Sequence, residues 1–175
     1  MKRNRRWVQI FILGIAAIIG VIVIMGSVFK EDTSVGIGKK APDFQLVGLD
    51  GKVYSLSDYK GKSVVINFWG TFCPPCVREM PALQAQYEKW KDQDVEFLGI
   101  NLNESRIAIE SFIQKSGVKY PILLDDDRIR KKYRVMSYPT TLYVDANSII
   151  QDIFVGEMTE NDIQSRINKL KGDTK

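Results

Sequence analysis

The chain alternates continuous apolar runs with amphipathic stretches. Residues 64–69 and 95–102 consist mainly of β-branched, aliphatic and aromatic residues, a composition typical of strands that are buried on both faces. In residues 75–90 the apolar side chains recur every three or four positions, which predicts a helix with one buried face. Similar spacing predicts helices over residues 107–116 and 160–170. Strands that alternate with helices in this order predict an α/β domain.

Shorter patterns complete the predicted sheet. Residues 44–49 and 52–56 predict a β-hairpin, because the Asp50-Gly51 pair between them favours a two-residue turn in which both residues have positive φ. The remaining short elements are a strand over 122–124, a helix over 128–133, and a final antiparallel pair over 141–144 and 149–155.

A different pattern occupies the N-terminal part of the chain. Residues 7–29 contain no charged side chain, and this run is long enough for a helix that crosses a membrane. The basic residues of segment 1–6 precede this run, so the N-terminus is expected in the cytoplasm and the rest of the chain outside it. We therefore predict a signal-anchor helix over 7–29, a linker over 30–40 and an extracytoplasmic domain over 41–175. A cleaved signal peptide is the alternative, although its apolar region is usually only about 7–15 residues long.

The net charge of +4 changes none of this, because it comes from one end of the chain. Four of the 25 Lys and Arg residues lie in the first six positions, which leaves 21 basic residues against 21 acidic ones. The basic pI is therefore no indication of nucleic-acid binding. The chain also has no His. We predict neither a nucleic-acid partner nor a cofactor.

The candidate chemistry lies in the sequence Cys73-Pro74-Pro75-Cys76, which holds both cysteines of the chain. The pair falls where a predicted buried strand ends and a helix begins. Free amides and the dipole at a helix N-terminus stabilise a thiolate, which is the attacking species in disulfide exchange. Cys73 precedes the helix and is predicted to be the exposed attacking residue. Cys76 lies one turn further in and is predicted to resolve the mixed disulfide.

Three other roles are conceivable for the two cysteines. A structural disulfide is common outside the cytoplasm, but a bridge that closes so short a loop stabilises little. A structural zinc site takes four ligands, and the chain has no His and no further Cys, so no metal site is predicted. Inert core cysteines fit poorly with two prolines at a strand–helix junction. A redox-active pair is the favoured interpretation.

Several motifs together resemble one family. They are the ten residues from Asn67 to Cys76 (NFWGTFCPPC), the following Glu79-Met80-Pro81, and the later SYPTT (137–141), APDF (41–44) and NLNES (101–105). With these motifs the chain resembles the TlpA/ResA branch of the thioredoxin superfamily over residues 38–171. The resemblance implies a thioredoxin-like fold with an N-terminal β-hairpin. It also implies an α/β insertion, formed by the helix over 107–116 and the strand over 122–124.

The resemblance also implies roles for individual residues. Glu79 would belong to the active site and shuttle a proton during exchange, whereas without the family an exposed helix charge is the favoured interpretation. Pro139 would follow a cis peptide bond, and the backbone before it would pair with the substrate chain. We assign Tyr138, Pro139 and Trp69 to substrate binding. Pro74 stands where family members often carry an acidic residue, so their cysteine pKa and reduction potential cannot be transferred to this chain.

The family further implies a function. The protein would reduce disulfides outside the cytoplasm, with the haem-binding cysteines of apocytochrome c as the predicted substrate and a CcdA-like membrane protein as thiol donor. A reductase for another target, such as one in spore-envelope synthesis, is an alternative, and so is a non-catalytic binding module. An oxidase of this fold commonly has His between the cysteines, and a copper carrier needs CxxxC with His. This chain has CxxC and no His, so neither class is favoured. A peroxiredoxin needs Thr-x-x-Cys, whereas Thr71 lies two residues before Cys73.

Overall fold

The computed structural model describes residues 3–28 and 35–172, and within the first range the side chains of residues 7 and 11–22. The chain divides into two units, 1–33 and 34–175. The first unit contains helix α1 (Arg3–Val28). Among the residues that the structure describes, no helix is both long and apolar enough to cross a membrane. The anchor therefore stays a prediction, and residues 1–2, 29–34 and 173–175 of the predicted segments lie outside the described ranges.

The second unit is built on one seven-stranded sheet with the strand order β2-β1-β5-β4-β3-β6-β7. The central strands β3, β4 and β5 are parallel to one another, and the outer strands pair antiparallel. The strands are β1 (Gln45–Gly48), β2 (Val53–Ser55), β3 (Ser63–Trp69), β4 (Val95–Leu102), β5 (Ile122–Asp125), β6 (Thr140–Val144) and β7 (Ile150–Val155). The helices are η1 (Leu56–Tyr59), α2 (Pro74–Trp90), α3 (Arg106–Ser116), α4 (Arg128–Lys132) and α5 (Glu160–Leu170).

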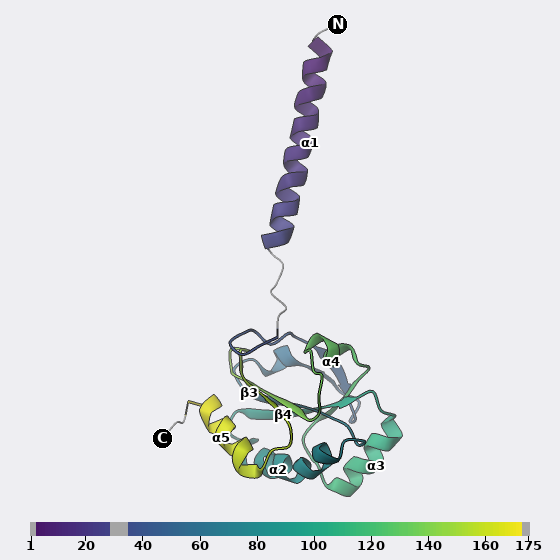
Figure 1. The fold of residues 1–175 in the computed structure, drawn as a ribbon, viewed down its shortest axis with the longest axis vertical. Helices are drawn as coiled ribbons and strands as arrows, with labels where there is room; N and C mark the ends of the chain where they lie inside the picture. The colour runs from purple at the N-terminus through teal and green to yellow at the C-terminus, as the bar shows by residue number, and fades with distance from the viewer. Residues whose placement is uncertain (1–2, 29–34, 173–175) are drawn as a thin grey trace. The chain divides into compact units, whose positions relative to one another are not determined.

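Helices cover both faces of the sheet. Helices α2, α3 and α5 lie against one face, and α4 lies against the other (Figure 1). All seven residues of β3 are buried, as expected of a central strand with a core on each side. The core on the α2 side contains both cysteines, whereas the core on the α4 side contains Leu142 of β6 and Tyr133. The sheet therefore separates the redox pair from a second apolar layer.

The predicted elements agree with this fold to within two residues at most strand and helix ends. The prediction of a two-residue hairpin turn, however, is wrong. The amide of Gly48 donates to the Lys52 carbonyl at 2.8 Å, which closes a three-residue loop around Asp50. Of the loop residues only Gly51 has positive φ, at 79°. The Asp50 carboxylate accepts hydrogen bonds from the Lys52 amide and the Tyr54 hydroxyl, and these bonds stabilise the longer loop.

Candidate active site

The two cysteines form a disulfide at the N-terminus of α2. Cys73 is the N-cap residue of the helix, and its Sγ accepts the Cys76 amide at 3.3 Å. Pro74 and Pro75 occupy the first positions of the helix and have no N–H, so the Cys76 amide is the first α2 donor that can reach this sulfur. A thiolate on Cys73 would receive the same hydrogen bond, which favours its formation in the reduced protein.

The two cysteine residues differ in their exposure to solvent. Cys73 is 7% exposed and Cys76 is 0% exposed. The order matches the predicted roles of attacking and resolving cysteine. The prediction of a well-exposed Cys73 is wrong for this oxidised state, because the side chain packs in the core on the α2 side of the sheet.

A tight turn leads into Cys73. The Cys73 amide donates to the Gly70 carbonyl at 3.2 Å. A side chain at position 70 would meet the Phe72 ring, since a Cβ there would lie 2.4 Å from Phe72 Cε1. The exposed Phe72 ring also contacts the Tyr138 ring edge-on, with 6.3 Å between ring centroids. Phe72 and Tyr138 therefore form an aromatic rim that joins the cysteine loop to the proline loop.

The Tyr138-Pro139 peptide bond is cis, as the family resemblance implies. Two contacts hold this loop in place. The Gly156 amide donates to the Pro139 carbonyl at 2.9 Å, and the Thr140 hydroxyl donates to the Ser137 carbonyl at 2.7 Å. Tyr138 is half-buried and packs against both cores of the domain. The proline loop thus lies at the end of the sheet where the two faces meet.

Glu79 lies one helical turn after Cys76 and is fully buried. Its carboxylate accepts the Asn67 side-chain amide at 2.8 Å and the Met158 backbone amide at 3.2 Å. No Lys or Arg pairs with it among the residues that the structure describes. Burial removes water from the carboxylate and raises the pKa of Glu79 from 4.5 to about 7, although the two hydrogen bonds act in the opposite direction. A group with this pKa gives and takes a proton readily near neutral pH.

Asn67 connects Glu79 to the proline loop. The amide nitrogen of Asn67 also donates to the Thr141 hydroxyl at 2.9 Å. The Asn67 side-chain oxygen is buried and accepts no hydrogen bond from any residue in the described ranges. Because an amide carries both a donor and an acceptor, rotation of this group by half a turn would present an acceptor to a protonated Glu79.

Trp69, which is predicted to bind the substrate, does not lie at the surface of the site. Its side chain is fully buried and contacts the Phe112 ring of α3, with 5.4 Å between ring centroids. A substrate cannot reach this side chain in the oxidised protein, so the assignment of Trp69 to substrate binding is not supported. The strand end that carries Trp69 is enclosed by α2 and α3 rather than open to solvent.

One residue that braces the site was given no role by the sequence. Glu104, within the NLNES motif, accepts the Thr71 amide at 2.7 Å and also the Thr71 hydroxyl. The Asn101 side-chain amide donates to the same carboxylate at 2.8 Å. Glu104 therefore fixes the backbone two residues before Cys73. The NLNES motif marks the segment that contains Glu104. The contact with Thr71 spans 33 positions, however, and no local pattern identifies Thr71 as the partner of Glu104.

The family of the chain follows from comparison with known proteins. The model of the AhpC/TSA family matches residues 37–153. "Thiol-disulfide oxidoreductase ResA" of Geobacillus kaustophilus is 40% identical over 174 residues, which cover 98% of this chain and 99% of that protein. The protein of the same name from Bacillus subtilis is 38% identical over 177 residues and 99% of both chains.

Solved structures share the fold. A putative thiol:disulfide interchange protein DsbE from Chlorobium tepidum superposes with a TM-score of 0.72 and 27% identity, covering 79% of this chain and 98% of the other. StoA from Bacillus subtilis gives a TM-score of 0.64 and 26% identity, covering 71% of this chain and 95% of the other. The thioredoxin-like α/β fold is thereby confirmed. With a Cys73–Cys76 pair at the helix N-terminus, the chain belongs to the ResA thiol-disulfide oxidoreductases of the AhpC/TSA family and is a protein-disulfide oxidoreductase.

Proposed function

We propose that this oxidoreductase works as a reductase of extracytoplasmic proteins and that the uncharged segment 7–29 anchors it in the cell membrane. The observation that carries the proposal is the buried Glu79 carboxyl behind the cysteine pair, with its pKa raised to about 7. Such a group supplies a proton acceptor for a cysteine that has no access to solvent. A static structural disulfide has no need of one.

The proposed reaction has two exchange steps. The Cys73 thiolate attacks one sulfur of the substrate disulfide, a mixed disulfide forms, and the other substrate sulfur leaves as a thiolate. Glu79 then takes the proton from the Cys76 thiol, and the new thiolate attacks Cys73 Sγ. The second substrate sulfur leaves and takes up a proton. The substrate has gained two electrons, and the protein is left with the disulfide seen in the structure.

The proposed substrate is apocytochrome c, whose haem-binding cysteines must be thiols before haem is attached. A CcdA-like membrane protein would return the two electrons to Cys73 and Cys76. The support for both is the family resemblance, together with relatives named ResA over nearly the whole chain. The proposed placement is a single-pass protein with its N-terminus in the cytoplasm, supported by the uncharged run over 7–29.

The direction of electron flow is tested by the reduction potential of the Cys73–Cys76 couple in the full-length protein. We expect a value near or below that of thioredoxin, roughly −270 mV, because a reductase must be a strong donor. A value near about −120 mV, typical of a disulfide-forming oxidase, would refute the reductase assignment.

The substrate is tested by deleting the gene and measuring holocytochrome c. We expect holocytochrome c to be lost and to return with the wild-type gene but not with a Cys73→Ser variant. Normal levels in the deletion strain would exclude apocytochrome c as the substrate and favour another extracytoplasmic target. Full rescue by Cys73→Ser would instead support a non-catalytic binding role.

A further inference from the structure

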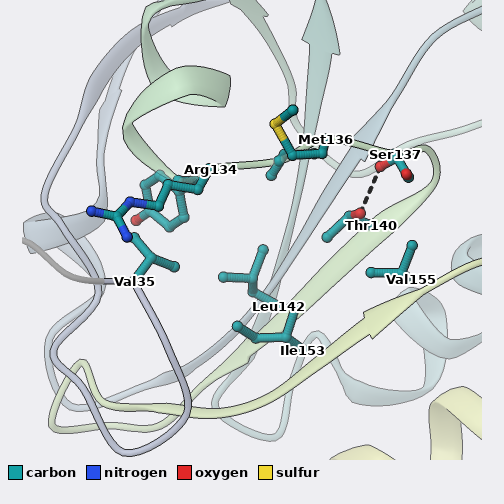
Figure 2. A pocket seen from close by; sticks show the side chains of 10 residues that line it. Val35, Arg134, Met136, Ser137, Thr140, Leu142, Ile153 and Val155 are labelled. Atoms are coloured by element: carbon teal, nitrogen blue, oxygen red, sulfur yellow. Dashed lines mark hydrogen bonds between the residues drawn. The ribbon is translucent and has the colours of Figure 1, made fainter.

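A cavity lies on the α4 side of the sheet, on the face away from the cysteines. Its volume is about 210 Å³. Paired residues of the last two strands form its floor, since Thr140 faces Val155 and Leu142 faces Ile153 across β6 and β7. Met136 stands at its edge (Figure 2). Strand β7 is the last strand of the sheet in the described part of the chain, and the segment around Lys39 pairs with its first residue, Ile150.

The cavity adjoins the substrate side of the redox site. Met136 and Ser137, which both line it, immediately precede the cis peptide bond before Pro139. Val155 lines it as well, and the next residue, Gly156, donates its amide to the Pro139 carbonyl at 2.9 Å. A polypeptide that pairs with the backbone before Pro139, as the family resemblance implies, would therefore lie next to residues that line this cavity.

The size and chemistry of the cavity restrict what it can hold. Pockets for drug-sized ligands and cofactors usually measure about 300–1,000 Å³, so this one is suited to one or two side chains. Met136 is 84% exposed and Val155 is 58% exposed, so an apolar side chain that enters the cavity covers apolar surface that otherwise faces water. Arg134 also lines the cavity, is exposed, and forms no ion pair with any residue in the described part of the chain.

We propose that this cavity is a specificity subsite that holds an apolar side chain of the substrate polypeptide, close in sequence to its disulfide. The proposal rests on the proposed function, because it needs a polypeptide disulfide as substrate. An apolar side chain buried between Met136 and Val155 leaves water, which strengthens binding without touching the reacting sulfurs. Arg134 at the rim favours an acidic residue beside that side chain over a basic one.

The experiment uses the full-length protein and disulfide-bonded peptides in which one Leu is moved position by position away from the cysteine, with Ala peptides as reference. We expect one Leu position to raise kcat/KM by about tenfold, through KM. Met136→Lys and Val155→Lys should abolish that advantage. Ile107→Lys and Val53→Lys are matched controls, because these residues are 79% and 56% exposed on other elements and should retain it.

A small aromatic disulfide serves as a substrate that tests thiol exchange at Cys73 alone, because it has no polypeptide that could occupy the subsite. Its rate should be equal in the wild type and all four variants. Equal kinetics for Leu and Ala peptides in the wild type would overturn the subsite while leaving the reductase assignment intact. If the protein oxidises dithiol peptides instead of reducing disulfides, the reductase assignment fails, but the Leu preference must still appear because both directions share one mixed disulfide. Loss of self-association in Met136→Lys would show that a second copy of the chain covers the cavity, and would overturn the proposal.

Discussion

Replacement of Glu79 by Gln tests whether the buried carboxyl is poised to exchange a proton. In the unfolded chain this carboxyl ionises near pH 4.5, whereas in the folded protein burial raises the pKa to about 7. Below pH 4.5 both states are protonated. Between these values the unfolded state releases the proton and the folded state keeps it, so stability falls as pH rises. Above pH 7 both states are ionised and the loss is complete.

The magnitude follows from the two pKa values. The difference between 4.5 and about 7 corresponds to about 3 kcal/mol, at about 1.4 kcal/mol for each pKa unit. Gln at position 79 does not titrate, and the side-chain oxygen of Asn67, which is unpartnered within the described residues, can accept a hydrogen bond from its amide. Relative to Glu79→Gln, the oxidised wild type should therefore lose about 3 kcal/mol of unfolding free energy between pH 4.5 and 7.

The assay is denaturant unfolding of both proteins across that pH range, with the disulfide intact. Glu88→Gln on the same helix is the control. Hydrogen bonds from Lys91 and Lys119 lower the pKa of Glu88, so its contribution to stability is present above pH 4.5 and is lost at more acid pH, opposite in sign. If the difference between the wild type and Glu79→Gln stays constant from pH 4.5 to 7, Glu79 has an ordinary pKa and the proposed proton shuttle is refuted.

Three other variants test the remaining parts of the site. Cys76→Ser should accumulate a mixed disulfide with substrate on non-reducing gels, and its absence would contradict the assigned order of attack. Asn67→Ala removes a hydrogen bond that lowers the pKa of Glu79, so the inflection in the pH profile of the resolving step should move to higher pH; an unchanged profile would contradict this coupling. Glu104→Ala should cost about 1–3 kcal/mol and shift the reduction potential, because the Thr71 amide loses its acceptor. Glu104→Gln keeps an acceptor and should recover most of both effects, whereas equal loss in the two variants would show that the charge matters rather than the geometry.

The parts of the fold that were predicted correctly have strong local patterns. Strand β4 and helix α5 have the predicted limits, because long apolar runs and three-to-four spacing each allow a single arrangement. The position of the cysteines follows from the same patterns. Helical spacing places Glu79 on the same face as Cys76, but without the family resemblance an exposed charge is the favoured interpretation, so its burial does not follow from the local pattern.

The contacts that complete the site join distant parts of the chain, and local patterns do not contain them. Glu79 meets the Met158 amide 79 positions away. Trp69 belongs to a strand that is apolar throughout, so its sequence cannot show that α3 closes over it. Met136 and Val155 belong to two separate segments of the sequence, and neither segment has a pattern that marks them as neighbours. Their common cavity arises only when the last two strands pair.

The seven-stranded sheet has a consequence for how such a protein changes over generations. The thiols and Glu79 lie in the layer between the sheet and α2, whereas the cavity lies in the layer beneath α4. The two layers share the backbone of the sheet and meet at Tyr138. Mutations around the cavity therefore leave the proton-transfer and thiol groups in place. A lineage can drift toward new polypeptide partners on one side of the sheet while selection preserves electron transfer on the other.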